Sequence, residues 1–168
     1  MNKTSYLSSA IFTSATLLIS LLIPTMAQAE DVKTTPGNAC KQSDGTQVVD
    51  FQWGSPYIRN RANSYRRVAC PIVRDNTTTT WGTAAFYTDV RLFNAGGTVS
   101  CYLVSSDAAG VLQNWDFQAT AVGGLVTLQN DLNLSQVNGY YNLECTLPPN
   151  SRVNGYRIGE YTSTDSNN

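Results

Sequence analysis

The sequence predicts an all-β fold, an antiparallel β-sandwich of about eight strands held by two disulfides. Three observations predict it. Short strand-like segments recur along the 168-residue chain with turn residues between most of them. Apolar and polar residues alternate within several of these segments, as in strands with one buried face. Four cysteines all lie beyond an N-terminal export signal, so they are expected to meet an oxidising compartment.

The export signal covers residues 1–29. Lys3 gives it a basic start, residues 10–23 form an apolar run broken only by Thr and Ser, and Ala27-Gln28-Ala29 has the small-x-small pattern of a cleavage site. The apolar run is too short for a membrane anchor, and no membrane span is expected after cleavage. We therefore expect a secreted or periplasmic protein.

The remaining chain suits one domain. Residues 30–45 are rich in turn formers and predict an irregular N-terminal segment tied down by Cys40, and the polar residues 162–168 predict a mobile tail. Between them, residues 46–161 predict a sandwich of jelly-roll or immunoglobulin-like type. Its expected strands are 46–53, 65–74, 83–93, 98–106, 111–121, 124–130, 139–147 and 152–161.

Two of these strands suggest a hairpin. Val90 and Leu92 share one parity in 83–93, and Val99 and Cys101 share one parity in 98–106. A turn at 94–97 would pair Leu92 with Val99 and Val90 with Cys101, which places both apolar sets on one buried face.

The outward face of this predicted hairpin carries the candidate binding residues. They are Tyr87, Asp89, Arg91 and Tyr102. An aromatic surface edged by Asp, Arg and Ser suits stacking on sugar rings, with hydrogen bonds to the hydroxyl groups. The alternative is that a loop or the second sheet covers this face. In the strand 111–121, Val111, Trp115 and Phe117 share a parity, and we expect that set to face the core.

The cysteines predict disulfides, because none of them is spaced as C-x-x-C. Three pairings are open, and we favour Cys40–Cys70 with Cys101–Cys145. Cys145 falls on the apolar parity of 139–147, as Cys101 does in its own strand, so the two can meet on a buried face.

Composition excludes several chemistries. The chain has no histidine, which removes Ser-His-Asp catalysis and imidazole-bound zinc. A net charge of −1 without a clustered positive surface argues against nucleic-acid binding. The oxygen-rich stretches 131–133 and 75–76 could be candidates for calcium, but neither supplies the six or more oxygens that the ion needs. We expect no metal, no cofactor and no catalytic residue. No spacing selects a glycosidase pair among the carboxylates Asp89, Asp107, Asp116, Asp131 and Glu144.

Several short motifs together resemble a group of small exported bacterial β-domain proteins. The motifs are Cys70-Pro71-Ile72-Val73-Arg74-Asp75-Asn76, then Cys101, then Cys145-Thr146-Leu147-Pro148-Pro149 with Arg152. The group shares a C-P-I/V-x-R-D-N segment, a later pair of cysteines and an L-P-P-x-S/A-R segment. The resemblance implies an exported bacterial β domain with this disulfide framework. It implies no activity and no functional residues.

Three hypotheses follow. The first is a non-catalytic module that binds a glycan or another cell-surface polymer through the four candidate residues. The second is a structural or surface-associated protein that assembles through its edge strands. A carboxylate-dependent glycosidase or an enzyme inhibitor ranks below both. The oligomeric state is left open.

Overall fold

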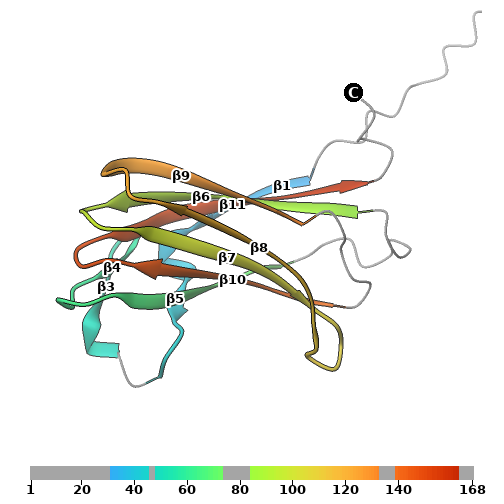
Figure 1. Cartoon of the computed structure of the whole chain (residues 1–168), viewed down its shortest axis with the longest axis horizontal. Coiled ribbons are helices and arrows are strands. Elements are labelled where there is room, and N and C mark those ends of the chain that lie inside the picture. The colour runs from blue at the N-terminus through green and yellow to red at the C-terminus, as the bar shows by residue number, and fades with distance from the viewer. Residues whose placement is uncertain (1–30, 46–47, 74–83, 133–138, 163–168) are drawn as a thin grey trace, which may run out of the picture.

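The computed structural model describes residues 31–45, 48–73, 84–132 and 139–162. Two antiparallel sheets lie face to face, with the core between them (Figure 1). Parts of the chain singled out above lie outside the described residues: the export signal, residues 75–76, Asn133 and the tail from residue 163. Among the described residues, no helix has the length and apolar character needed to cross a membrane.

Within the described ranges, eleven strands make up the two sheets. The six-stranded sheet has the order β3-β4-β11-β6-β9, with β1 also paired to β11. Its strands are β1 (Asp31–Pro36), β3 (Phe51–Trp53), β4 (Ile58–Asn60), β6 (Ala84–Asn94), β9 (Gly124–Leu132) and β11 (Arg152–Thr162). The five-stranded sheet has the order β2-β5-β10-β7-β8. Its strands are β2 (Lys41–Gln42), β5 (Arg66–Pro71), β7 (Val99–Ser106), β8 (Leu112–Thr120) and β10 (Tyr140–Leu147).

The strand order is that of a jelly roll. The β7–β8 hairpin lies in one sheet, and the strands before and after it, β6 and β9, pair in the other. The next pairs continue this winding, β7 with β10 and β6 with β11. The predicted sandwich is therefore confirmed, as the jelly-roll alternative and with eleven strands rather than about eight.

The N-terminal segment differs from the prediction. We expected residues 30–45 to be irregular, but Asp31–Pro36 forms β1 and pairs along β11 from Glu160 to Gly155. Short 3₁₀ turns follow at Gly37–Ala39 and Val48–Asp50. The sequence of β1 shows no apolar alternation. It is held by backbone pairing with β11, a strand more than a hundred residues away, which the local sequence does not reveal.

The predicted hairpin between β6 and β7 is wrong. β6 pairs with β11 and β9, whereas β7 pairs with β10 and β8, so the connection at 95–98 crosses from one sheet to the other. The predicted burial of its apolar set is nevertheless confirmed, since Val90, Leu92, Val99 and Cys101 all lie in the core. A crossing between sheets turns both apolar faces towards the same interior, just as a hairpin would.

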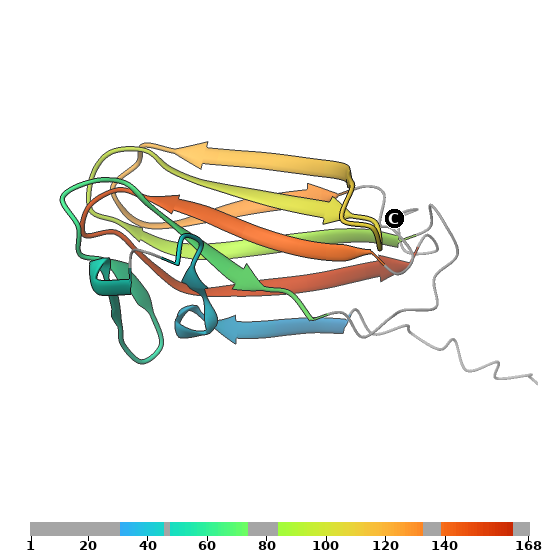
Figure 2. The same cartoon turned by 90° about the horizontal axis from the view of Figure 1, so that it is seen from below.

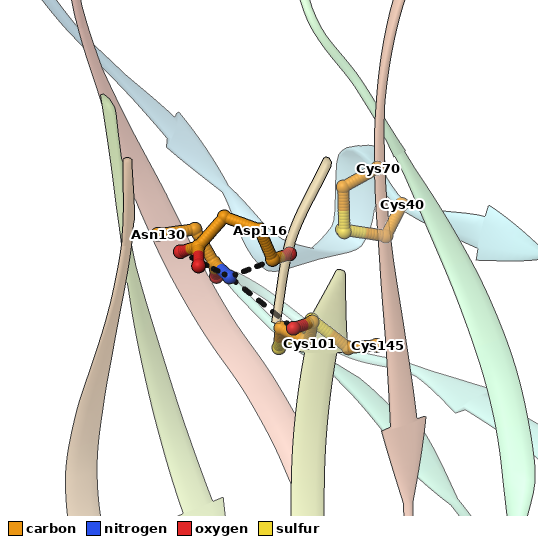
Figure 3. Close-up of a disulfide and its surroundings, with 6 residues drawn as sticks. All are labelled: Cys40, Cys70, Cys101, Asp116, Asn130 and Cys145. Carbon is orange, nitrogen blue, oxygen red and sulfur yellow. Dashed lines mark hydrogen bonds between the residues drawn. A yellow bond between two sulfur atoms is a disulfide. The ribbon is translucent and has the colours of Figure 1, made fainter. Parts of the chain in front are cut away.

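Both predicted disulfides are present. Cys40 joins Cys70 and Cys101 joins Cys145, with all four side chains buried (Figure 3). Cys101 and Cys145 lie directly opposite each other on the adjacent strands β7 and β10. This bridge therefore links two strands of one sheet.

A polar seam joins the two sheets where β8 and β9 meet. Asn130 of β9 is fully buried, and its Nδ2 donates to the carbonyl oxygens of Cys101 and Asp116, both at 3.2 Å (Figure 3). It also lies 3.3 Å from the Asp116 carboxylate, which in turn accepts from the backbone amide of Asp131 at 3.0 Å. A buried amide needs polar partners. The polar residues of β8, with Asp116 among them, therefore point inward toward Asn130, and the alternate residues of the strand point outward.

Candidate functional site

The opposite parity of β8 faces solvent and carries aromatic side chains. Trp115 is 57% exposed and Phe117 is 40% exposed, beside Tyr102 of β7 at 41%. The expectation that Trp115 and Phe117 face the core is therefore wrong, and Val111 is exposed as well. Parity indicates which residues share a face but not which way that face points. Asn130 of β9 determines which face of β8 points inward, because it binds Asp116.

Tyr102, Trp115 and Phe117 form one contiguous surface, which we call the aromatic platform. Tyr102 lies directly opposite Phe117 across the β7–β8 ladder, with ring centroids 4.5 Å apart and planes inclined by 40°. The Tyr102 and Trp115 centroids are 6.3 Å apart. The platform lies on the outer face of the five-stranded sheet, the sheet nearest the viewer in Figure 2.

The turn between β7 and β8 is fixed by its own side chain. Asp107 Oδ1 accepts hydrogen bonds from the amides of Ala109 and Val111, both at 2.9 Å. Gly110 takes a positive φ of 80°, a conformation that glycine adopts without strain. Because this hairpin supplies all three platform residues, its register sets their spacing.

Polar groups border the platform on the side of β10. Glu144 lies directly opposite Tyr102, and Asn142 lies opposite Val104. The hydroxyl of Ser43 donates to Glu144 Oε1 at 2.6 Å, which fixes the carboxylate beside the Tyr102 ring. The outer face of this sheet thus combines a stacking surface with hydrogen-bonding groups at one edge.

The four predicted binding residues do not come together. Tyr102 belongs to the platform, whereas Tyr87, Asp89 and Arg91 lie on β6, on the outer face of the other sheet. The prediction that Tyr87 and Tyr102 share one outward face is therefore wrong. It depended on the β6–β7 hairpin, which the structure does not have.

Tyr87 has the predicted outward parity but is only 3% exposed. It pairs with Gly159 of β11, and a Cβ on that glycine would lie 2.0 Å from a carbon of the Tyr87 ring. The ring thus covers the β11 backbone at a position where only glycine fits. The guanidinium of Arg157 lies over the same ring, 5.7 Å from its centroid. Tyr87 is therefore a covered packing residue and offers a ligand little surface.

The carboxylates considered for catalysis have separate structural partners. Asp89 forms an ion pair with Arg157, whose Nε lies 3.0 Å from Asp89 Oδ2, and Asp107 holds its turn. Asp116 and Asp131 meet at the seam. Burial, followed by the charge of Asp116, raises the pKa of Asp131 above its ordinary value. Asp116 is bonded to Asn130 and to the Asp131 amide, so its carboxylate serves the seam.

In the part of the chain that the structure describes, no three or more side chains of the Cys, Asp and Glu types gather as metal ligands would.

A scan against family models and a search of curated proteins found no match, so the resemblance to exported bacterial β-domain proteins stays a prediction. Among solved structures, the chain is similar to the C-terminal CBM6 of a laminarinase from Zobellia galactanivorans. They share 13% identity and a TM-score of 0.44, over 77% of this chain and 99% of the other.

Two further solved structures are similar at the same level. One is a carbohydrate-binding module of Cellvibrio mixtus lichenase 5A in complex with cellotriose, with 16% identity, a TM-score of 0.41, and coverage of 76% and 95%. The other is the GH26-CBM35 β-(1,4)-mannanase of Podospora anserina, with 11% identity and a TM-score of 0.45. There the match covers 78% of this chain and 28% of the mannanase. Likeness of this degree says nothing about a shared ligand.

Proposed function

We propose that the protein is a non-catalytic binding module that takes a neutral glycan on the aromatic platform. One observation carries the proposal: Tyr102, Trp115 and Phe117 are contiguous, each at least 40% exposed, and lie on a rigid sheet face. Contiguous exposed apolar surface on a soluble domain marks an interaction site, since isolated exposed residues would be commonplace.

The chemistry of the platform favours a sugar over a purely apolar partner. The rings can stack on the C–H faces of pyranose residues, while Glu144 and Asn142 beside them can accept or donate hydrogen bonds to hydroxyl groups. The aromatic residues lie on paired strands, so they are ordered before a ligand binds and lose little conformational freedom. We also propose that the protein is exported, because two disulfides favour an oxidising compartment.

Binding to a panel of soluble β-glucan, xylan and mannan, followed by calorimetry on the best ligand, tests the proposal. We expect Trp115→Ala and Phe117→Ala each to weaken binding about tenfold, because each change removes a stacking ring. Leu125→Ala is the matched control: Leu125 is 77% exposed on the other sheet, and its loss should leave affinity unchanged. Equal binding by the wild type and Trp115→Ala would refute the platform.

The second candidate function is assembly through an edge strand. β8 forms one edge of the five-stranded sheet, is nine residues long and contains neither Pro nor Lys. One feature opposes this function: the charged side chain of Asp116 points inward on β8, and inward-pointing charges at an edge strand hinder pairing with another chain. Analytical ultracentrifugation over a wide concentration range tests this candidate. Assembly through β8 predicts oligomers in the wild type and their loss in Gln113→Pro, a substitution on this edge strand. A monomer at all concentrations would argue against assembly.

A further inference from the structure

A concave feature lies on the other sheet from the platform. It is a cavity of about 380 Å³ on the outer face of the six-stranded sheet, which we call the arginine cavity. This volume falls within the range of about 300–1,000 Å³ typical of small-molecule sites. Its walls include Thr34, Pro36, Pro56, Arg91, Asn154 and Arg157.

A glycine of β11 lies between the two arginines in the wall of the cavity, close to the backbone of β1. On β11, Gly155 pairs directly with Arg91 of β6, and Arg157 pairs with Asp89 one step further along the same face. Gly159, further along β11 on the same face, pairs with Tyr87 of β6, and there the Tyr87 ring covers the backbone. No aromatic ring covers Gly155, which lines the open cavity.

The backbone around the cavity is held in place. β1 runs alongside β11, with Pro36 opposite Gly155 and Thr34 opposite Arg157. The carbonyl oxygen of Pro56 accepts a hydrogen bond from the amide of Asn38 at 2.8 Å, which ties the β3–β4 loop to the end of β1. Both prolines are therefore fixed parts of the wall.

The charge of the cavity is positive. Asp89 forms an ion pair with Arg157, through a contact of 2.5 Å between Oδ2 and Nη2. Arg91 is exposed and has no hydrogen-bond or ion-pair partner among the described residues. Two guanidinium groups thus face one carboxylate, and the uncompensated charge is carried by Arg91.

We propose that the arginine cavity binds a small organic molecule through an oxyanion group, carboxylate or sulfate, held by Arg91 with Arg157 beside it. Guanidinium groups bind such oxyanions through paired N–H donors. The prolines and the arginine stems offer apolar surface to the carbon skeleton of the ligand, and Thr34 and Asn154 offer polar contacts. This site is independent of the platform and takes a different class of ligand.

The test is a titration followed by two-dimensional ¹H–¹⁵N NMR at constant ionic strength. Sodium glucuronate is the probe, glucose is its neutral counterpart, and sodium sulfate tests for the oxyanion alone. We expect saturable shifts at Gly155 and at the Arg91 side chain with glucuronate and none with glucose. If sulfate competes with glucuronate, the oxyanion supplies most of the affinity; if it does not, the organic skeleton is also needed, and both results support the site.

Arg91→Gln should weaken glucuronate binding tenfold or more, because it removes a charged hydrogen-bond donor. Since Arg91 is exposed, this variant is expected to keep the melting temperature of the wild type. Arg61→Gln is the matched control, since Arg61 is an exposed arginine outside the cavity. Equal shifts with glucose, an unchanged affinity in Arg91→Gln, or an equal loss in Arg61→Gln would each overturn the proposal.

Discussion

Asn130 on β9 and Asp116 on β8 join the two sheets, with Asn130 Nδ2 3.2 Å from the Asp116 carbonyl oxygen and 3.3 Å from its carboxylate (Figure 3). This contact determines which face of β8 meets solvent. With Asp116 turned to the seam, the alternate residues Trp115 and Phe117 must point outward, where they complete the aromatic platform.

Replacing Asn130 should therefore destabilise the domain. Asn130→Ala removes the side-chain donor to the carbonyl oxygens of Cys101 and Asp116 and one of the donors to the Asp116 carboxylate, and we expect a loss of about 1–3 kcal/mol in the free energy of unfolding. Urea denaturation measures it. Asn63→Ala is the control, since Asn63 lies in an exposed loop, and its stability should match the wild type. Equal stability of the two variants would contradict the role given to the seam.

Asp131→Asn should stabilise the protein at neutral pH. Burial and the nearby charge of Asp116 raise the pKa of Asp131, so the folded state holds the proton more tightly than the unfolded chain. The ionised form therefore costs stability above the ordinary pKa of an aspartate, and this cost disappears as the pH falls and the group is protonated. We expect a melting temperature about 1–2 °C higher at pH 7, because an exposed like-charge contact is weak. The difference should vanish near pH 3, and a constant gap would rule out this cause.

Tyr156 should make the fold sensitive to alkali. Its side chain is buried, its hydroxyl donates to the Pro71 carbonyl oxygen at 2.6 Å, and burial raises its pKa to about 12, with a hydrogen bond to Thr35 opposing the shift. The unfolded chain ionises near pH 10, so stability falls between about pH 10 and 12, by up to about 1.4 kcal/mol per pH unit.

Tyr156→Phe lacks the ionisable group and isolates this effect. The variant loses the hydrogen bond to Pro71 and should be less stable than the wild type at pH 8. Urea denaturation at pH 8, 10 and 11 should then show the gap narrowing as the pH rises. Parallel stability curves would mean that Tyr156 does not titrate with unfolding.

Removing the Cys101–Cys145 bridge should weaken the fold. The bridge closes a loop with a sequence separation of 44, and the double change Cys101→Ala, Cys145→Ala should cost about 2–4 kcal/mol of unfolding free energy. Chemical denaturation of the variant and of the wild type under non-reducing conditions measures the difference. Stability within 0.5 kcal/mol of wild type, roughly the scatter of a neutral surface substitution, would show that the bridge contributes little.

Alternation and cysteine placement predicted much of the fold. Leu143, Cys145 and Leu147 are buried as their parity indicates, and both disulfides formed between the expected partners. The partner of each strand was harder to predict. The pattern that buries Val90 with Cys101 is satisfied equally by a hairpin and by a crossing between sheets, and local sequence does not distinguish them.

The site was predicted in part. Tyr102 was identified on an outward face, but Trp115 and Phe117 were expected in the core because they share the apolar parity of 111–121. The Asn130–Asp116 contact, which reverses that assignment, spans a sequence separation of 14. One local signal existed for Tyr87: a glycine within a strand, Gly159, often marks a place where another group approaches the backbone.

The bridge between Cys101 and Cys145 lies beneath the aromatic platform, since the next residue along β7 is Tyr102 and its partner on β10 is Glu144. A covalent bond therefore fixes the separation of a stacking ring and a hydrogen-bonding carboxylate on the other side of the same sheet. If the platform binds a glycan as proposed, a reductant that opens this bridge should weaken glycan binding as well as the fold.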